Sequence, residues 1–283
     1  MSEVEGKLCV ITGSNSGIGK ETTLGLARKK AKLVMVVRNP ERGNKGREEI
    51  VSKSENKSID LMICDLSSMQ SIRRFIQEFK AKYDRLDVLI NNAGAVFYKR
   101  QMTVDGFERT MAVDYLGPFL LTHELLSILK SSAPSRIINL SSGNYRTGKI
   151  DFDDLQNAKN YRGMRAYANA KLMVLMFTYE LARRLEGTGV SANCVLPGFV
   201  RTNLGRNSRS RLQALLFGMM WPFQISAQEA ARAIVYLASS EEVEGVTGKC
   251  FAKMKQVDTS DASRDLETQK ILWDMTERLL GIS

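Results

Sequence analysis

The chain has 283 residues, of which 43% are hydrophobic and 25% are charged, a composition typical of soluble globular proteins. This length is ample for a buried core and fits either one large domain or two small ones. The net charge is +10, but most lysines and arginines are spread along predicted helix faces, where they indicate solvated surface and not a nucleic-acid site.

The cysteines argue against a disulfide framework and against a zinc site. Cys9, Cys64, Cys194 and Cys250 lie far apart, each in or beside an apolar run, and no CxxC pair occurs. We therefore expect buried thiols in a reducing compartment and no bound metal. No basic region followed by an apolar stretch opens the sequence, and nothing approaches about 18 consecutive apolar residues. The sequence thus predicts neither a signal peptide nor a transmembrane segment, and we expect a cytoplasmic protein.

Short β-branched runs alternate with longer amphipathic stretches along the chain. Residues 69–83, for example, place Ile72, Phe75, Ile76 and Phe79 on one helix face. Such alternation predicts βαβ units and a parallel sheet with helices on both faces. The predicted fold is α/β: one doubly wound Rossmann-type domain over residues 1–283, with a central parallel sheet of about seven strands. The predicted strands are 8–12, 32–37, 59–64, 88–90, 136–140, 190–196 and 249–252.

Three segments depart from this rhythm. Residues 143–163 are polar and contain three glycines, which predicts a loop. Residues 203–226 begin basic and then become strongly apolar, which is unusual for an exposed loop. We interpret them as a lid over an apolar substrate pocket, while burial in a core or a subunit contact, and peripheral membrane contact aided by nearby arginines, stay open. Residues 256–283 form a C-terminal extension.

A glycine-rich turn follows the first predicted strand. Glycines at such a place let the chain turn tightly and bring backbone N–H groups against a pyrophosphate. The spacing is GxxxGxG, which differs from the GxGxxG pattern of lactate-type dehydrogenases. The sequence therefore predicts a dinucleotide site at Gly13, Ser14, Asn15, Ser16, Gly17, Ile18 and Gly19.

Arg38 stands where an acidic residue would hold the adenosine ribose of NAD, about 20 residues after the glycine turn. A guanidinium pairs well with a 2′-phosphate, which favours NADP as the cofactor. The alternative is an ordinary surface arginine at a strand end.

The YxxxK pattern occurs twice, at Tyr145–Lys149 and at Tyr167–Lys171. The first follows a predicted strand directly and contains Gly148, so helical geometry cannot be assumed there. Tyr167 and Lys171 begin a long helical pattern, in which residues four apart share a face. An ammonium beside a phenol stabilises the phenolate and so favours proton exchange. We predict Tyr167 and Lys171 as the catalytic pair.

These motifs together resemble the short-chain dehydrogenase/reductase family. The resemblance rests on Thr12–Gly19, Asn91–Gly94, Ser142, Tyr167–Lys171 and Pro197–Gly198, which occur in the family's order across roughly residues 7 to 255. The surrounding sequence resembles the retinol-dehydrogenase-like branch. The resemblance implies that Asp65 contacts adenine, that Asn92, Ala93 and Gly94 lie along the cofactor, and that the remaining cofactor contacts come from Leu66, Tyr167, Lys171, Pro197, Gly198, Val200 and Thr202.

The resemblance also assigns Ser142, with Ser141 as the competing candidate, to donate a hydrogen bond to the substrate oxygen. One departure concerns Asp114, where the family usually has an asparagine that is thought to hold a water next to the lysine. An aspartate still accepts from such a water and can pair with Lys171, but it cannot donate when ionised. We count Asp114 among the predicted catalytic residues.

Two other enzyme classes are poorly supported. His123, the single histidine, lies inside a predicted helix, and no GxSxG motif occurs, so a serine hydrolase is disfavoured. A metalloenzyme lacks histidine and cysteine ligands. The remaining alternative is an NADP-binding sensor or scaffold with little turnover.

The preferred hypothesis is an NADP(H)-dependent oxidoreductase that moves a hydride between nicotinamide and a lipophilic aldehyde, ketone or alcohol, such as a retinoid, a steroid or a fatty-chain compound. No nucleic-acid partner is expected, and a homodimer stays open.

Overall fold

The central element is a sheet of eight strands in the order β3-β2-β1-β4-β5-β6-β7-β8, seen in a computed structural model that describes residues 4–200 and 225–282. Strands β1 to β7 pair in parallel, and β8 runs antiparallel to β7. The strands are β1 (Leu8–Thr12), β2 (Lys32–Val37), β3 (Ile59–Ile63), β4 (Val88–Asn91), β5 (Ser135–Leu140), β6 (Val190–Val195), β7 (Cys250–Ala252) and β8 (Lys255–Gln256).

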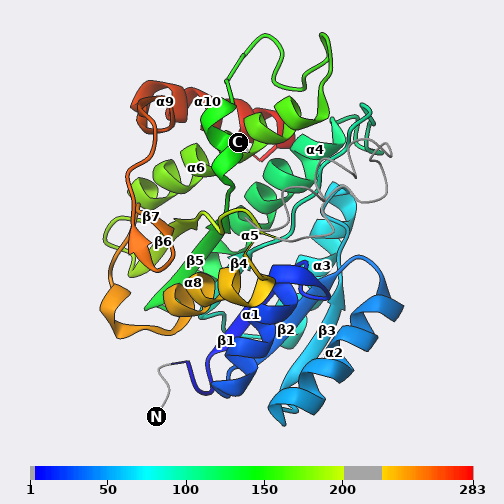
Figure 1. The fold of residues 1–283 in the computed structure, drawn as a ribbon, viewed down its shortest axis with the longest axis vertical. Coiled ribbons are helices and arrows are strands. Elements are labelled where there is room, and N and C mark those ends of the chain that lie inside the picture. The colour runs from blue at the N-terminus through cyan, green and yellow to red at the C-terminus, as the bar shows by residue number, and fades with distance from the viewer. Residues whose placement is uncertain (1–3, 201–224, 283) are drawn as a thin grey trace.

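Helices cover both faces of this sheet, which confirms the predicted doubly wound α/β fold (Figure 1). One face carries α1, α2 and α8, and the other carries α3, α5, α6 and α10. The helices are α1 (Gly17–Arg28), α2 (Pro40–Ser54), α3 (Met69–Lys82), α4 (Arg109–Met111), α5 (Gly117–Ser131), α6 (Gly163–Arg184), α8 (Ala227–Ser239), α9 (Asp261–Arg264) and α10 (Leu266–Leu280), with a π-helical turn at Ala112–Leu116 and 3-10 turns at Gly143–Thr147 and Glu241–Val243.

The inner strands β1, β2 and β4 are mostly apolar because both of their faces are buried. In β1, Val10 packs into one core and the neighbouring Ile11 into the other, and each is fully buried. Alternate residues of a strand point to opposite faces, so a continuous apolar run serves both helical layers. This explains why short β-branched runs, and not an alternating pattern, indicated the parallel strands.

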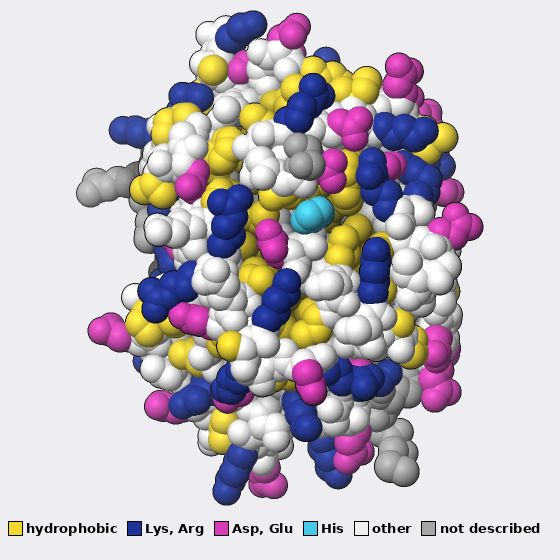
Figure 2. Space-filling model, turned by 180° about the vertical axis from the view of Figure 1, so that it is seen from behind, with side chains coloured by type: hydrophobic (Ala, Val, Ile, Leu, Met, Phe, Trp, Pro, Cys, Tyr) yellow, Lys and Arg dark blue, Asp and Glu magenta, His cyan; other side chains and the backbone are white. Residues whose placement is uncertain are grey.

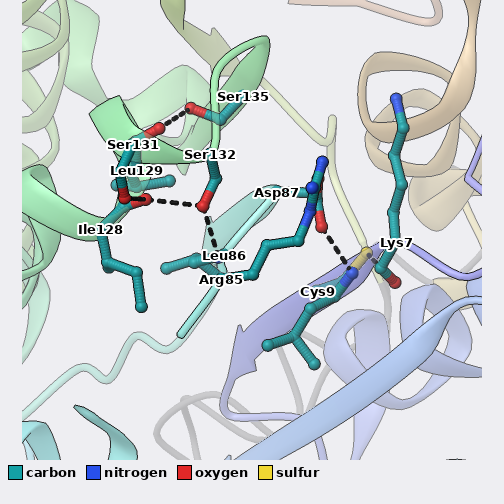
Figure 3. Close-up of polar contacts among 11 residues, drawn as sticks. Lys7, Cys9, Arg85, Leu86, Asp87, Ile128, Leu129, Ser131, Ser132 and Ser135 are labelled. Carbon is teal, nitrogen blue, oxygen red and sulfur yellow. Dashed lines mark hydrogen bonds and ion pairs between the residues drawn. The ribbon is translucent and has the colours of Figure 1, made fainter. Parts of the chain in front are cut away.

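Polar side chains fix the amino ends of the central strands, opposite the edge where the strands end (Figure 3). The buried carboxylate of Asp87 accepts hydrogen bonds from the Leu8 backbone at 2.8 Å and from Arg85 Nε at 2.8 Å. The hydroxyl of Ser132 accepts from the Leu86 backbone and donates to the Ile128 carbonyl. These contacts tie α5 and the β4 entry to β1, and they satisfy backbone groups that burial would otherwise leave unpaired.

The structure has eight strands where the sequence predicted about seven. The additional strand is β8, which is too short to show a hydrophobic pattern. Its two residues are exposed, and the turn before it contains Lys253 and Met254 at positive φ values of 48° and 63°. Lysine and methionine are not turn-forming residues, so sequence patterns do not indicate a hairpin there. The segment 143–163, predicted as a loop, begins instead with the 3-10 turn Gly143–Thr147.

The C-terminal extension joins the core. Trp273 of α10 packs between Phe119 of α5 and Phe177 of α6, with ring centroids 4.7 and 5.8 Å away. The Tyr115 hydroxyl also forms a 2.7 Å hydrogen bond with Thr276 of α10. The extension therefore covers the outer face of the layer formed by α5 and α6.

Charges of both signs are interspersed on the face seen in Figure 2, with hydrophobic side chains between them. This distribution agrees with the interpretation of the lysines and arginines as solvated surface. Within residues 4–200 and 225–282, every helix is too short or too polar to cross a bilayer.

Replacing Trp273 with alanine should destabilise the whole fold, because a large buried ring would leave a cavity between α5, α6 and α10. We expect a loss of about 3–5 kcal/mol in the free energy of unfolding, measured by urea denaturation. The matched control is Ile271→Ala on the same helix, where the side chain is 38% exposed and the loss should stay within about 1 kcal/mol. Equal small losses for both variants would show that α10 is not part of the cooperative core.

Candidate active site

The predicted site residues meet at one edge of the sheet because parallel strands all end there. The glycine turn follows β1, Arg38 follows β2, Asp65 follows β3 and Asn92 follows β4. Ser142 and Pro197 follow β5 and β6. The order of the strands reverses between β1 and β4, and open α/β sheets bind ligands beside such a reversal.

The glycine turn forms a cradle that larger residues would fill. Gly13 has a φ of +66°, and a Cβ on Gly19 would lie 2.4 Å from the Gly13 carbonyl oxygen and from Asn92 Nδ2. Helix α1 starts at Gly17 with no acidic residue in its first turn, so its positive end is open to an anion. The buried Ser14 hydroxyl has no hydrogen-bond partner among residues 4–200 and 225–282. These features fit a dinucleotide pyrophosphate.

Thr12 holds the β4 loop against this cradle, a role that sequence reasoning missed. Its hydroxyl accepts hydrogen bonds from the backbone N–H groups of Asn92 and Ala93, both at 3.0 Å. Asn92 Nδ2 donates back to the Thr12 carbonyl at 2.7 Å. A buried polar residue at the end of an apolar strand is the signal that could have identified Thr12.

Arg38 and Asp65, predicted to contact the adenosine half of the cofactor, lie just beyond the ends of β2 and β3. Arg38 is exposed just beyond β2 and forms no ion pair with the described acidic residues. Asp65 uses one oxygen to accept from the backbone and hydroxyl of Ser67, at 2.9 and 2.7 Å. Leu66 is buried and packs in the core below. The Arg38 guanidinium is thus exposed to solvent, whereas the Asp65 carboxylate stabilises the turn after β3 through Ser67.

Helix α6 brings Tyr167 and Lys171 together, both almost completely buried. The Lys171 Nζ atom lies 5.6 Å from the centroid of the Tyr167 ring and donates to the Leu140 carbonyl at 3.2 Å. Burial is the largest influence on the pKa of Tyr167 and raises it, and the negative charge of Asp114 acts in the same direction. The Lys171 ammonium and a hydrogen bond with Ser142 lower it. The pKa remains above its ordinary value, so in this state burial outweighs the lowering expected from Lys171 alone.

Asp114 lies directly against Lys171, as the sequence had suggested. One carboxylate oxygen is 3.4 Å from Lys171 Nζ, and the other accepts from the Ala95 backbone at 2.7 Å. Burial raises the pKa of Asp114 to about 6, although Lys171 opposes this. Burial alone would lower the pKa of Lys171, but Asp114 reverses the effect and raises it. Asp114 sits in the π-helical turn, a feature often found at functional sites.

The competing candidates have structural partners elsewhere. Tyr145 is buried in a 3-10 turn, and its hydroxyl accepts from the Ser260 backbone at 3.3 Å. The Ser141 hydroxyl donates to the Lys171 carbonyl at 2.7 Å and so anchors α6 to the end of β5. Ser142 is less buried: its hydroxyl accepts a long 3.4 Å contact from the Asn144 backbone and forms a hydrogen bond with Tyr167. It therefore lies beside the phenol of the predicted catalytic pair.

The remaining predicted residues lie after β6. Gly198 has a φ of +84°, and the segment beyond it pairs back through Val200 with Ile225. Pro197 begins this segment, and Phe199 accepts a backbone hydrogen bond from Ile225 at 2.9 Å. Thr202, and residues 203–224 of the expected lid, lie outside the described residues.

Comparison with known proteins gives consistent matches. A family model described as short chain dehydrogenase matches residues 7–213. Retinol dehydrogenase 12 of Mus musculus is 42% identical over 99% of this chain and 88% of its own length, and retinol dehydrogenase 14 of Homo sapiens is 42% identical over 99% and 88%. The crystal structure of an uncharacterized protein from Mycobacterium paratuberculosis matches with a TM-score of 0.81 and 29% identity, covering 99% of this chain and 96% of that one.

Replacing Gly19 with alanine should destroy the cradle, because its Cβ would overlap the Gly13 backbone and Asn92. Thermal unfolding with and without NADPH measures this, since a ligand that binds only the folded state raises the melting temperature. We expect the NADPH-dependent rise to disappear in Gly19→Ala. It should persist in Gly143→Ala, where an added Cβ meets no atom within 4 Å. A retained rise in Gly19→Ala would mean that the dinucleotide lies elsewhere.

Proposed function

The chain belongs to the short-chain dehydrogenase family, within its retinol-dehydrogenase-like branch, and is an oxidoreductase; from this we propose that it uses NADP(H) to interconvert a lipophilic carbonyl compound and its alcohol. The observation that carries the proposal is the meeting of Tyr167, Lys171 and Ser142 beside the glycine cradle.

In the proposed reaction, the nicotinamide supplies the hydride for reduction of a carbonyl and takes it up in oxidation of an alcohol. Ser142 donates a hydrogen bond to the substrate oxygen as negative charge develops on it. Tyr167 gives that oxygen its phenolic proton in reduction and receives the proton in oxidation. Lys171 stabilises the phenolate from beneath the ring. Ser141 fixes the position of Lys171 through its backbone.

The choice of NADP rests on Arg38. The adenosine ribose of a dinucleotide in the cradle would lie near the end of β2, where an acidic residue would select NAD. This chain offers an exposed guanidinium there, and no described acidic side chain neutralises it. Such a group favours the additional 2′-phosphate of NADP.

The substrate class rests on two observations. The similar curated proteins are named as retinol dehydrogenases. In this chain, Met164 at the start of α6 and Phe199 beyond β6 lie at the edge that carries Tyr167, and they are 40% and 39% exposed. Exposed apolar side chains next to a polar reaction centre suit a retinoid or another long apolar aldehyde or alcohol.

Replacing Tyr167 with phenylalanine should abolish retinaldehyde reduction, because the substrate oxygen loses its proton donor. NADPH affinity should stay within a few-fold, because the phenol contributes mainly in the transition state. The rate of NADPH oxidation with retinaldehyde measures turnover, and fluorescence titration with NADPH measures affinity. Tyr145→Phe is the control and should keep activity, losing only the Ser260 contact. Binding of NADPH without turnover of any aldehyde by the wild type would favour a sensor or scaffold instead.

Replacing Arg38 with alanine should weaken NADPH binding roughly ten- to a hundred-fold, because a charge-assisted contact worth about 1.5–3 kcal/mol is lost. NADH binding should barely change. Fluorescence titration of both cofactors tests this, with Lys53→Ala at the other end of α2 as a charge-matched control. An equal loss for both cofactors would assign Arg38 a structural role.

A further inference from the structure

We propose that Asp114 is a positioning residue that holds a negative charge against Lys171 and thereby keeps the Tyr167 phenol protonated toward higher pH, which extends carbonyl reduction to higher pH and delays alcohol oxidation. The inference rests on the proposed function of Tyr167 and adds a role for the aspartate that replaces the family's usual asparagine.

The geometry makes the carboxylate and the ammonium one unit. The side chains of Lys171 and Asp114 are 4% and 0% exposed, and their charged atoms lie 3.4 Å apart. Gly94 closes over them, and a Cβ there would lie 3.2 Å from Lys171 Nζ and 3.5 Å from the nearer Asp114 oxygen. Solvent does not separate the two charges, so their effects on neighbours are weakly screened.

An asparagine would leave the ammonium uncompensated. Lys171 would then be held by the neutral Leu140 carbonyl, and its full positive charge would stabilise the Tyr167 phenolate. With Asp114 ionised, the pair is neutral overall, and the phenol experiences two opposing charges. In agreement with these opposing charges, Lys171 lowers the pKa of Tyr167 and Asp114 raises it.

The other charged groups around the pair do not reverse this balance. Glu108 lies near Asp114 and adds a further negative charge, which works in the same direction. Cys194 of β6 faces Lys171, and burial raises its pKa well above the ordinary value, so it remains a neutral thiol. Ser142 opposes the effect through one hydrogen bond to Tyr167.

The two directions of the reaction need different states of the phenol. Reduction consumes the proton of a neutral phenol, so it proceeds while Tyr167 is protonated. Oxidation delivers the alcohol proton to a phenolate, so its rate rises as Tyr167 ionises. If the Asp114 charge is removed, the rate of alcohol oxidation should therefore begin to rise at a lower pH. Because Asp114 itself takes up a proton near pH 6, wild type and variant should converge below that pH.

The test is Asp114→Asn, which keeps the side-chain size and leaves an oxygen for the Ala95 backbone. Phenolate absorbance in the ultraviolet is titrated against pH without substrate, in the wild type and in Asp114→Asn. The same titration of each protein with Tyr167→Phe added is subtracted, which leaves the signal of the Tyr167 phenol. We expect its midpoint about one pH unit lower in Asp114→Asn, equal to about a ten-fold change in proton affinity. Asp153→Asn, an exposed loop residue, removes the same charge and should leave the midpoint unchanged.

An unchanged or higher midpoint in Asp114→Asn would overturn the inference. If that variant does not fold, as judged by circular dichroism, Asp114→Ser replaces it with the same expectation. The pH profile of kcat/KM for alcohol oxidation should shift by the same amount as the optical midpoint. An optical shift in a protein that turns over no alcohol or aldehyde would sustain the role of Asp114 and reject the proposed function.

Discussion

The parallel pairing of the strands is the constraint on which the rest of this structure depends. Parallel strands end at one edge, so the glycine turn, Arg38, Asn92 and Ser142 meet there although they are far apart in sequence. At the opposite edge, Asp87 and Ser132 use polar contacts to fix the strand entries. The sheet thus has one end closed by its own side chains and another end where the predicted site residues gather, with Arg38 exposed to solvent.

Burial changes the chemistry of the groups at the available end. Removing Asp114, Lys171 and Tyr167 from water disfavours their charged forms, and the charges of Asp114 and Lys171 are stabilised by each other. A buried ammonium and carboxylate at 3.4 Å compensate each other, and the phenol above them responds to both. The consequence is that a change at Asp114 or Lys171 alters the ionisation of the other and of Tyr167.

The two YxxxK motifs show how far sequence reasoning reached. Gly148 was enough to disfavour Tyr145, and the structure places that hydroxyl against the Ser260 backbone. The choice between Ser141 and Ser142 had only a family resemblance behind it, whereas the structure shows that Ser141 donates to the Lys171 carbonyl. That contact joins the end of β5 to a helix 30 residues later, a separation that no local pattern encodes.

By itself, the sequence determined the α/β class, the positions of the parallel strands, the glycine-rich turn after the first strand and the helix that carries Tyr167 and Lys171. These features follow from local rules: hydrophobic periodicity, glycine spacing and i, i+4 geometry. Only the tertiary structure decided that Thr12 holds the β4 loop, that α10 packs Trp273 into the core, and that β8 extends the sheet. It also decided the ionisation of Asp114, because the cost of burying a charge depends on distant residues that surround it and not on its neighbours in the chain.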